Sequence, residues 1–222
     1  MARIHNRLPF KESDLLKSYR EADARARYLY DTDEKLVSYR QVLDLCANSK
    51  QCQKSRGVKK HQILFWTYLR IGDLFLQKNL DEYSKENLLN ALKAYENALE
   101  CAKGRNEQIE ILTKIRDIYR HLEDKTAALD TTLQMAELVD DALKIEIFLN
   151  LADEATHKSE EAYFLEQALK YVTQEKIILL QKCEKTLIIC AKLLEIYEKA
   201  GLKADMARIK SVETKTHEMM LS

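Results

Sequence analysis

Glycine and proline are scarce in this chain, and that scarcity restricts the fold more than any other feature. The 222 residues contain 4 Gly and 1 Pro, whereas average usage of ~7% and ~5% would give roughly 15 and 11. The hairpin turns and bulges of β-sheets depend on these residues, because Gly allows positive φ and Pro fixes φ. The sequence therefore predicts an all-α fold, with helices joined by short polar turns.

Hydrophobic residues recur at intervals of three and four, the period of an α-helix, along almost the whole chain. Asp31 and Asp33 are candidate caps for a helix that ends near Asn48. The stretch from Gln174 to Lys185 is a candidate for a break in a long helix. The polar, basic segment 49–61 is expected to be a connecting loop. The pattern predicts helices at about 11–30, 31–48, 61–79, 84–103, 106–122, 124–139, 141–156, 159–173, 175–199 and 202–219.

The helices come in pairs, and the pairs resemble one another. The segment YLRIGDLF at 68–75 is followed by ALKAYENAL at 91–99. These two segments resemble the tetratricopeptide repeat (TPR), in which small and aromatic residues alternate on a helix hairpin. Gly72, Ala91 and Ala98 are expected to let the two helices approach, while Tyr68, Phe75 and Tyr95 fill the gaps between adjacent pairs.

The resemblance covers about residues 62–219 and is irregular. Only the first repeat has a glycine on its first helix, none has the closing proline, and about seven extra residues separate Phe75 from Ala91. Gly201 is expected at the turn of the last pair. The resemblance implies an antiparallel helix-hairpin solenoid, a TPR-like α-α superhelix with about four helix pairs over residues 61–222. Residues 1–60 would form an N-terminal helical pair or cap with a basic loop.

Charge balances overall, with 36 basic and 36 acidic side chains. Residues 1–60 carry 14 basic and 8 acidic side chains, which is too weak a bias for a nucleic-acid partner. A basic run in the connecting loop is a candidate for contact with phosphates or an acidic partner, although such runs usually stay solvated. Its members are Lys50, Lys54, Arg56, Lys59 and Lys60.

The sequence also predicts a soluble, cytoplasmic protein. The five cysteines form an odd set without the spacing of a disulfide framework. Cys183 and Cys190 lie seven residues apart and are expected in the core. The N-terminus lacks the apolar region of a signal peptide, and no stretch has the ~20 apolar residues that a membrane helix needs, so we expect no membrane insertion.

Catalytic and cofactor motifs are missing, so we expect no enzyme and no cofactor. Glu154 and His157 have the Glu-x-x-His spacing of di-iron bundles, which places both side chains on one helix face, but such sites need two copies of the motif. Cys46, Cys52 and His61 fit no zinc spacing. A helical metal-binding protein therefore remains only a remote alternative.

Helical solenoids act mainly as concave binding surfaces. By the TPR resemblance, the groove would be lined by positions on the first helix of each pair. Most of the polar ones are acidic, so we expect a scaffold or adaptor that binds a basic or amphipathic segment of another protein. The predicted groove residues are Leu69, Asp73, Leu76, Glu110, Asp117, Arg120, Glu146, Asn150, Asp153, Glu195 and Glu198.

Two further interpretations stay open. Leu69 and Leu76, with surface methionines Met219 and Met220, would suit a chaperone for secreted or aggregation-prone partner proteins. The grip of TPR co-chaperones on acidic tails is disfavoured, because Leu69 and Asp73 stand where Lys and Asn would be needed. We also consider a homodimer through apolar positions of the last helix: Ile209, Val212 and Leu221.

Overall fold

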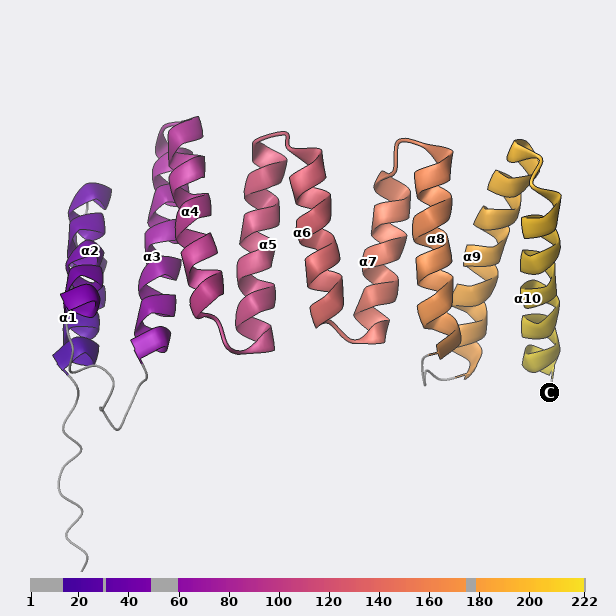
Figure 1. The fold of residues 1–222 in the computed structure, drawn as a ribbon, viewed down its shortest axis with the longest axis horizontal. Coiled ribbons are helices and arrows are strands. Elements are labelled where there is room, and N and C mark those ends of the chain that lie inside the picture. The colour runs from indigo at the N-terminus through magenta and orange to yellow at the C-terminus, as the bar shows by residue number, and fades with distance from the viewer. Residues whose placement is uncertain (1–13, 30, 49–59, 175–178, 222) are drawn as a thin grey trace, which may run out of the picture. The chain divides into compact units, whose positions relative to one another are not determined.

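The computed structural model describes residues 14–29, 31–48, 60–174 and 179–221, and all regular structure in these ranges is helical (Figure 1). The all-α prediction is confirmed. The ten helices are α1 (Asp14–Tyr28), α2 (Thr32–Asn48), α3 (Lys60–Asp81), α4 (Lys85–Cys101), α5 (Arg105–His121), α6 (Lys125–Leu138), α7 (Asp141–Glu154), α8 (Lys158–Gln174), α9 (Leu179–Ala200) and α10 (Lys203–Leu221).

Each helix expected from the hydrophobic period is present. Helix α9 runs without a break from Leu179 past Lys185, so the described part of 174–185 shows no break inside that helix, and residues 175–178 lie outside the described residues. Lys60 begins α3, while the other four members of the basic run, at 50, 54, 56 and 59, lie outside the described residues, as does Cys52.

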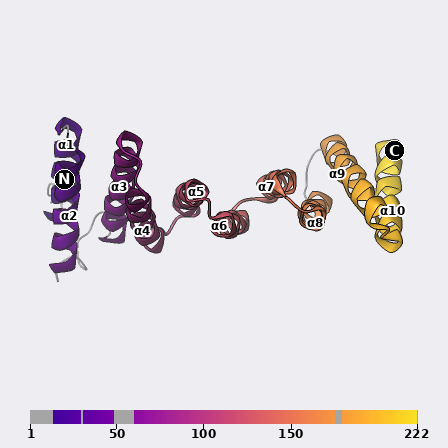
Figure 2. The ribbon, with the colours of Figure 1, turned by 90° about the horizontal axis from the view of Figure 1, so that it is seen from above.

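The chain forms two compact units, which we call unit 1 (residues 1–132) and unit 2 (residues 133–222). The boundary between them falls inside α6. The closely packed hairpins are α1–α2 and α3–α4 in unit 1, and α7–α8 and α9–α10 in unit 2. Figures 1 and 2 show α3 and α4 side by side from two directions. The prediction that residues 1–60 cap an array of repeats is not decided by this division and stays a prediction.

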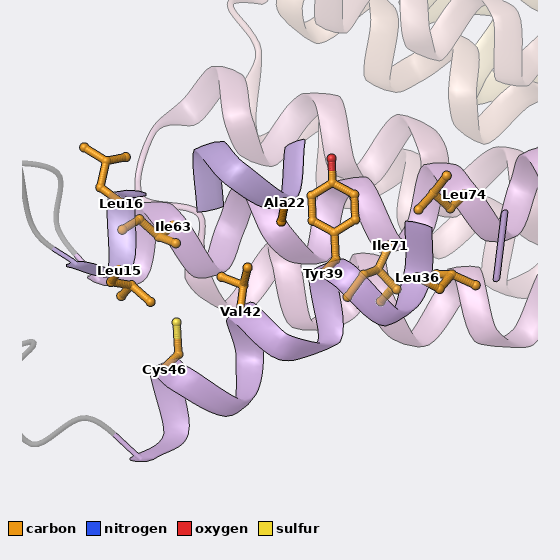
Figure 3. Close-up of a cluster of buried hydrophobic side chains, with 11 residues drawn as sticks. Leu15, Leu16, Ala22, Leu36, Tyr39, Val42, Cys46, Ile63, Ile71 and Leu74 are labelled. Atoms are coloured by element: carbon orange, nitrogen blue, oxygen red, sulfur yellow. The ribbon is translucent and has the colours of Figure 1, made fainter. Parts of the chain in front are cut away.

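Helix α3 joins two hydrophobic clusters of unit 1, because its opposite faces are both apolar. Ile63 and Ile71 pack with residues of α1 and α2, including Leu36 and Val42 (Figure 3). Phe65, on another face, packs with the buried residues of α4 and α5. Unit 2 has its own buried residues on four helices: Ile145, Leu165, Ile189, Leu193 and Ile209.

The close approach predicted for the first repeat is confirmed. Gly72 on α3 faces the ring of Tyr95 on α4, and a Cβ atom at position 72 would lie 2.5 Å from Cε1 of that ring. Tyr95, Ala91 and Ala98 are fully buried. A side chain at position 72 would therefore overlap the Tyr95 ring unless the ring or the helices shifted.

Turn chemistry follows the sequence at two ends. Asp31 Oδ1 accepts hydrogen bonds from the backbone N–H groups of Asp33, at 2.6 Å, and Glu34, at 3.4 Å, so Asp31 rather than Asp33 caps α2. Gly201 has φ 70° in the turn before α10, as expected for a glycine that ends a helix.

Two sequence interpretations are wrong. Glu154 is the last residue of α7 and His157 lies beyond it, so the two side chains do not share a helix face. Ile209 is fully buried against the rest of unit 2 rather than exposed at its end, and Val212 is half-buried. The side chain of Leu221 lies outside the described residues. The apolar end surface on which the homodimer interpretation depended is therefore not found at Ile209.

None of the described helices is both long and apolar enough to cross a bilayer.

Candidate protein-binding faces

The three groove positions predicted on α3 are only partly exposed. Leu69 and Leu76 are half-buried and pack against the cluster formed by α3, α4 and α5. They contribute to the core and expose only part of their side chains to a partner.

Asp73, the third position, is held by side chains of two other helices. Tyr95 on α4 donates a hydrogen bond from its hydroxyl to Asp73 Oδ1 (O···O 2.7 Å), and Lys114 on α5 donates one from Nζ (2.9 Å). Lys114 Nζ also lies 5.5 Å from the centre of the Tyr95 ring, a cation–π distance. Burial and the charge of Asp73 raise the pKa of Tyr95 well above its usual range. Asp73 therefore connects three successive helices.

The same arrangement occurs between the first three helices. Asp23 on α1 accepts a hydrogen bond from the hydroxyl of Tyr39 on α2 (2.8 Å) and lies 3.6 Å from the guanidinium of Arg70 on α3. Burial opposes ionisation of Asp23, but the hydrogen bonds from Tyr39 and Arg27 and the charge of Arg70 outweigh it, so the pKa of Asp23 is lowered.

Unit 2 contains a third example. Glu166 on α8 accepts a hydrogen bond from the hydroxyl of Tyr197 on α9 (2.7 Å) and two from the guanidinium of Arg208 on α10. We call each such set, with a carboxylate, a tyrosine and a cation on three successive helices, a bracket. None of the three brackets could be predicted from the sequence, because helical periodicity does not show which side chains of different helices form hydrogen bonds.

On α5 the predicted positions are exposed. Glu110, Asp117 and Arg120 all lie on the solvent side of the helix. Asp117 accepts hydrogen bonds from its neighbour Arg116, at 2.9 and 3.0 Å. An exposed pair of this kind contributes little to stability, so Asp117 remains available to a partner.

Unit 2 exposes all five of its predicted positions, on α7 and α9. Glu146, Asn150 and Asp153 lie on the outer side of α7, and Glu195 and Glu198 lie on the outer side of α9. Lys192 of α9 donates a hydrogen bond from Nζ to Asp153 Oδ1 (2.6 Å), which joins the two helices. We call this surface the α7–α9 face.

Two apolar side chains belong to the same face and were not predicted. Leu143 is 48% exposed and precedes Glu146 and Asn150 by three and seven residues, which places them on one side of α7. Ile188 is 57% exposed and precedes Glu195 by seven residues on α9. The seven-residue spacing was visible in the sequence, but nothing there separated these positions from core positions.

A pocket of about 460 Å³ lies at the end of the α3–α4 hairpin away from its turn, between the starts of α3 and α5. Its lining includes His61, Phe65, Cys101 and Glu107. Burial and the charge of Glu100 raise the pKa of the Cys101 thiol, which disfavours the reactive thiolate. Glu107 accepts the backbone N–H groups of Lys103 and Gly104, both at 3.0 Å. Glu107 therefore caps the start of α5.

Across the described ranges, no group of three or more His, Cys, Asp or Glu side chains is placed to hold a metal ion. Cys183 and Cys190 are buried, as expected, and Cys46 is buried as well.

Several solved structures of TPR-like proteins are similar to this chain. A Podosopora anserina protein, a kinesin light chain with nearly identical TPR-like repeats, has a TM-score of 0.42 and 9% identity, over 91% of this chain and 94% of its own. BtubC (BKLC) from P. vanneervenii has a TM-score of 0.37 and 14% identity, over 95% of this chain and 92% of its own. No protein-family model and no curated protein matches the sequence.

Proposed function

We propose that this chain is a protein-interaction scaffold, and that the α7–α9 face of unit 2 binds a basic, amphipathic segment of a partner protein. The observation that carries the proposal is the pairing of exposed apolar and acidic side chains on this face. Leu143 and Ile188 can contact apolar side chains of a partner, and Glu146 and Glu195 can contact its lysines and arginines.

Rigidity of the face supports the same proposal. Lys144 on α7 lies 4.9 Å from the ring of Tyr171 on α8, and that ring stacks on Phe148 of α7 at 5.8 Å, so α7 is held on α8. The exposed pair of Asp153 and Lys192 adds little to this stability. A surface that is already ordered loses little conformational freedom on binding. The exposed acidic positions of α5, Glu110 and Asp117, are proposed as a separate contact surface of unit 1.

Charge reversal on the face tests this function. The variant Glu146→Lys/Glu195→Lys should lose its partners from a native lysate, whereas Glu96→Lys/Asp130→Lys, which reverses two exposed carboxylates on α4 and α6, should keep them. Captured proteins are compared by quantitative mass spectrometry. Asp73 is left out because it holds Tyr95 and Lys114, so that its reversal would report on folding.

Salt separates charge-based from apolar recognition. Partners that depend on the acidic side chains should leave in high salt, since screening weakens exposed charge pairs. Partners that stay bound in high salt and tolerate the double reversal would instead favour the chaperone alternative, for which the exposed Met219 and Met220 give support. Equal capture by both charge variants would contradict the proposed face.

A further inference from the structure

The turn between α3 and α4 extends beyond the α1–α2 hairpin in unit 1. Helix α3 has 22 residues, compared with 17 in α2. In Figure 1 the α3–α4 turn projects past the turn that joins α1 and α2. This is the place where the sequence has about seven residues more than a TPR. We call residues 79–86 the tip of this hairpin.

Two large apolar side chains of the tip face solvent. Leu80 is 87% exposed and Tyr83 is 70% exposed, the first at the end of α3 and the second in the turn. Neither contributes to the cluster beneath them, so the fold does not need them there. Their exposure has a cost in free energy, because apolar area in water is unfavourable, and burial by another molecule would remove that cost.

The backbone of the tip is fixed by specific contacts. Asn79 Oδ1 accepts a hydrogen bond from the backbone N–H of Ser84 (2.9 Å), which closes the turn. The N–H of Glu82 bonds the carbonyl of Lys78 (3.0 Å), and Lys78 Nζ bonds both carboxylate oxygens of Asp33 on α2 (2.8 and 2.9 Å). Leu80 and Tyr83 therefore project from an ordered turn that is attached to α2, which reduces the entropy lost on binding.

Carboxylates surround the two apolar side chains. Asp81 and Glu82 lie between Leu80 and Tyr83, and Glu86 lies in the first turn of α4; all three are exposed. The hydrogen bond from Lys78 to Asp33 raises the pKa of Lys78, and the charges of Asp31 and Glu82 add to this effect. Within residues 79–86 these three carboxylates stand against one lysine, Lys85, so the tip has an excess of negative charge.

We propose that the tip is a second docking site, at which Leu80 and Tyr83 enter an apolar depression of a partner protein bordered by Lys and Arg. The occupant is a protein surface with basic residues around an apolar centre, because carboxylates border both apolar side chains. The site lies in unit 1 and does not depend on the α7–α9 face.

Counter-selection of displayed peptides tests this site in the full chain. Short random peptides on phage are selected on the wild-type protein and depleted on the variant Leu80→Ser/Tyr83→Ser. We expect the surviving peptides to combine apolar residues with Lys or Arg. As synthetic peptides they should bind the double variant at least about tenfold more weakly, as expected for residues at the centre of an interface. Because both residues are exposed, the variant should melt at the wild-type temperature.

Two matched controls locate the binding. Leu89→Ser removes a leucine of α4 that is exposed outside the tip, and it should bind the peptides as the wild type does. Glu146→Lys/Glu195→Lys should also keep them, since it alters only the α7–α9 face. Loss of binding in that variant would place the peptides on the α7–α9 face and overturn the tip proposal without affecting the proposed function.

Three other results would overturn the tip proposal. These are the absence of any surviving peptide, an enrichment of acidic or uncharged peptides, and self-association of the wild type in sedimentation that Leu80→Ser/Tyr83→Ser removes. The last result would make a second copy of this chain the occupant.

Discussion

The bracket at Tyr95 in unit 1 and the bracket at Tyr197 in unit 2 have the same pattern of hydrogen bonds, but the tyrosine rings pack against different groups. Each tyrosine donates to a carboxylate of the preceding helix, at 2.7 Å in both cases, and each carboxylate also binds a cation of the following helix. Tyr95 lies directly over Gly72, whereas the glycine that the structure describes in unit 2, Gly201, lies in a turn.

This difference separates two contributions that are combined at Tyr95. In unit 1, an aromatic ring is packed against a helix backbone and also anchored by its hydroxyl. In unit 2, the hydroxyl of Tyr197 makes the same hydrogen bond, but no described glycine lies under its ring. The same polar contact thus joins three successive helices in both units, although the packing beneath it differs.

The largest expected effect comes from removing the N-terminal helices. A chain that starts near Val58 would expose Ile63, Ile71 and Leu74 of α3. Each large aliphatic side chain costs about 1.5–3 kcal/mol to expose, so we expect a loss of several kcal/mol and a melting temperature lower by roughly 10 °C. Hydrogen exchange should accelerate in α3 and remain unchanged in α9 and α10. An unchanged melting temperature would contradict the role of residues 1–60 as a cap.

A smaller effect is expected from Gly72→Ala. The new methyl group would overlap the Tyr95 ring, and overpacking of this kind costs about 1–3 kcal/mol. In a Tyr95→Ala background the same change should stabilise, because Ala favours a helix over Gly by about 1 kcal/mol. The free energies of unfolding of the wild type, the two single variants and the double variant, from urea denaturation, give the coupling between the two sites. If Gly72→Ala changed the free energy of unfolding in the same direction in both backgrounds, the contact would not limit the approach of the helices.

The smallest expected effect comes from removing single hydroxyl groups. Tyr95→Phe and Tyr197→Phe should each cost about 1 kcal/mol, the typical net value of a hydrogen bond. Exchange should accelerate only in the unit that carries the substitution. A loss in unit 2 caused by Tyr95→Phe would show that the brackets are not independent.

The same substitutions should change the response to alkaline pH. Burial, together with a neighbouring carboxylate, raises the pKa of Tyr95 and of Tyr197 above the ordinary value of 10.0. Their contribution to stability is fully present below about pH 10, and it is lost at higher pH because the unfolded chain ionises first. Denaturation at increasing pH should therefore show a weaker pH dependence for Tyr95→Phe than for the wild type. Equal pH dependence would contradict a raised pKa at this position.

Helical periodicity predicted the helices, and the TPR resemblance predicted the close approach of α3 and α4 at Gly72, because these depend on neighbours in sequence or on one hairpin. The sequence offered both Asp31 and Asp33 as the cap of α2, and Asp31 is the one that caps it. The TPR resemblance assigned Asp73 to a groove, although Tyr95 and Lys114 hold that carboxylate. The spacing of residues along one helix gives the side on which a carboxylate lies, but it does not show which cation of a later helix comes within reach.

Local helix ends were the second source of error. The spacing of Glu154 and His157 suggested one helix face only because α7 was expected to continue to residue 156, whereas it ends at Glu154. The exposure of Leu143 and Ile188 was missed for a different reason. Exposed and core positions of a helix can have the same period, and the packing of other helices decides which of them is covered.

Helix α3 takes part in two brackets at once: Arg70 reaches back to Asp23, and Asp73 reaches forward to Tyr95 and Lys114. A duplicated or transplanted copy of α3 would need the right partner on both sides. Repeats tied in this way are not interchangeable modules, so unequal recombination would rarely yield a working array. The lineage of such a chain would retain its number of helices while its repeats drift apart in sequence.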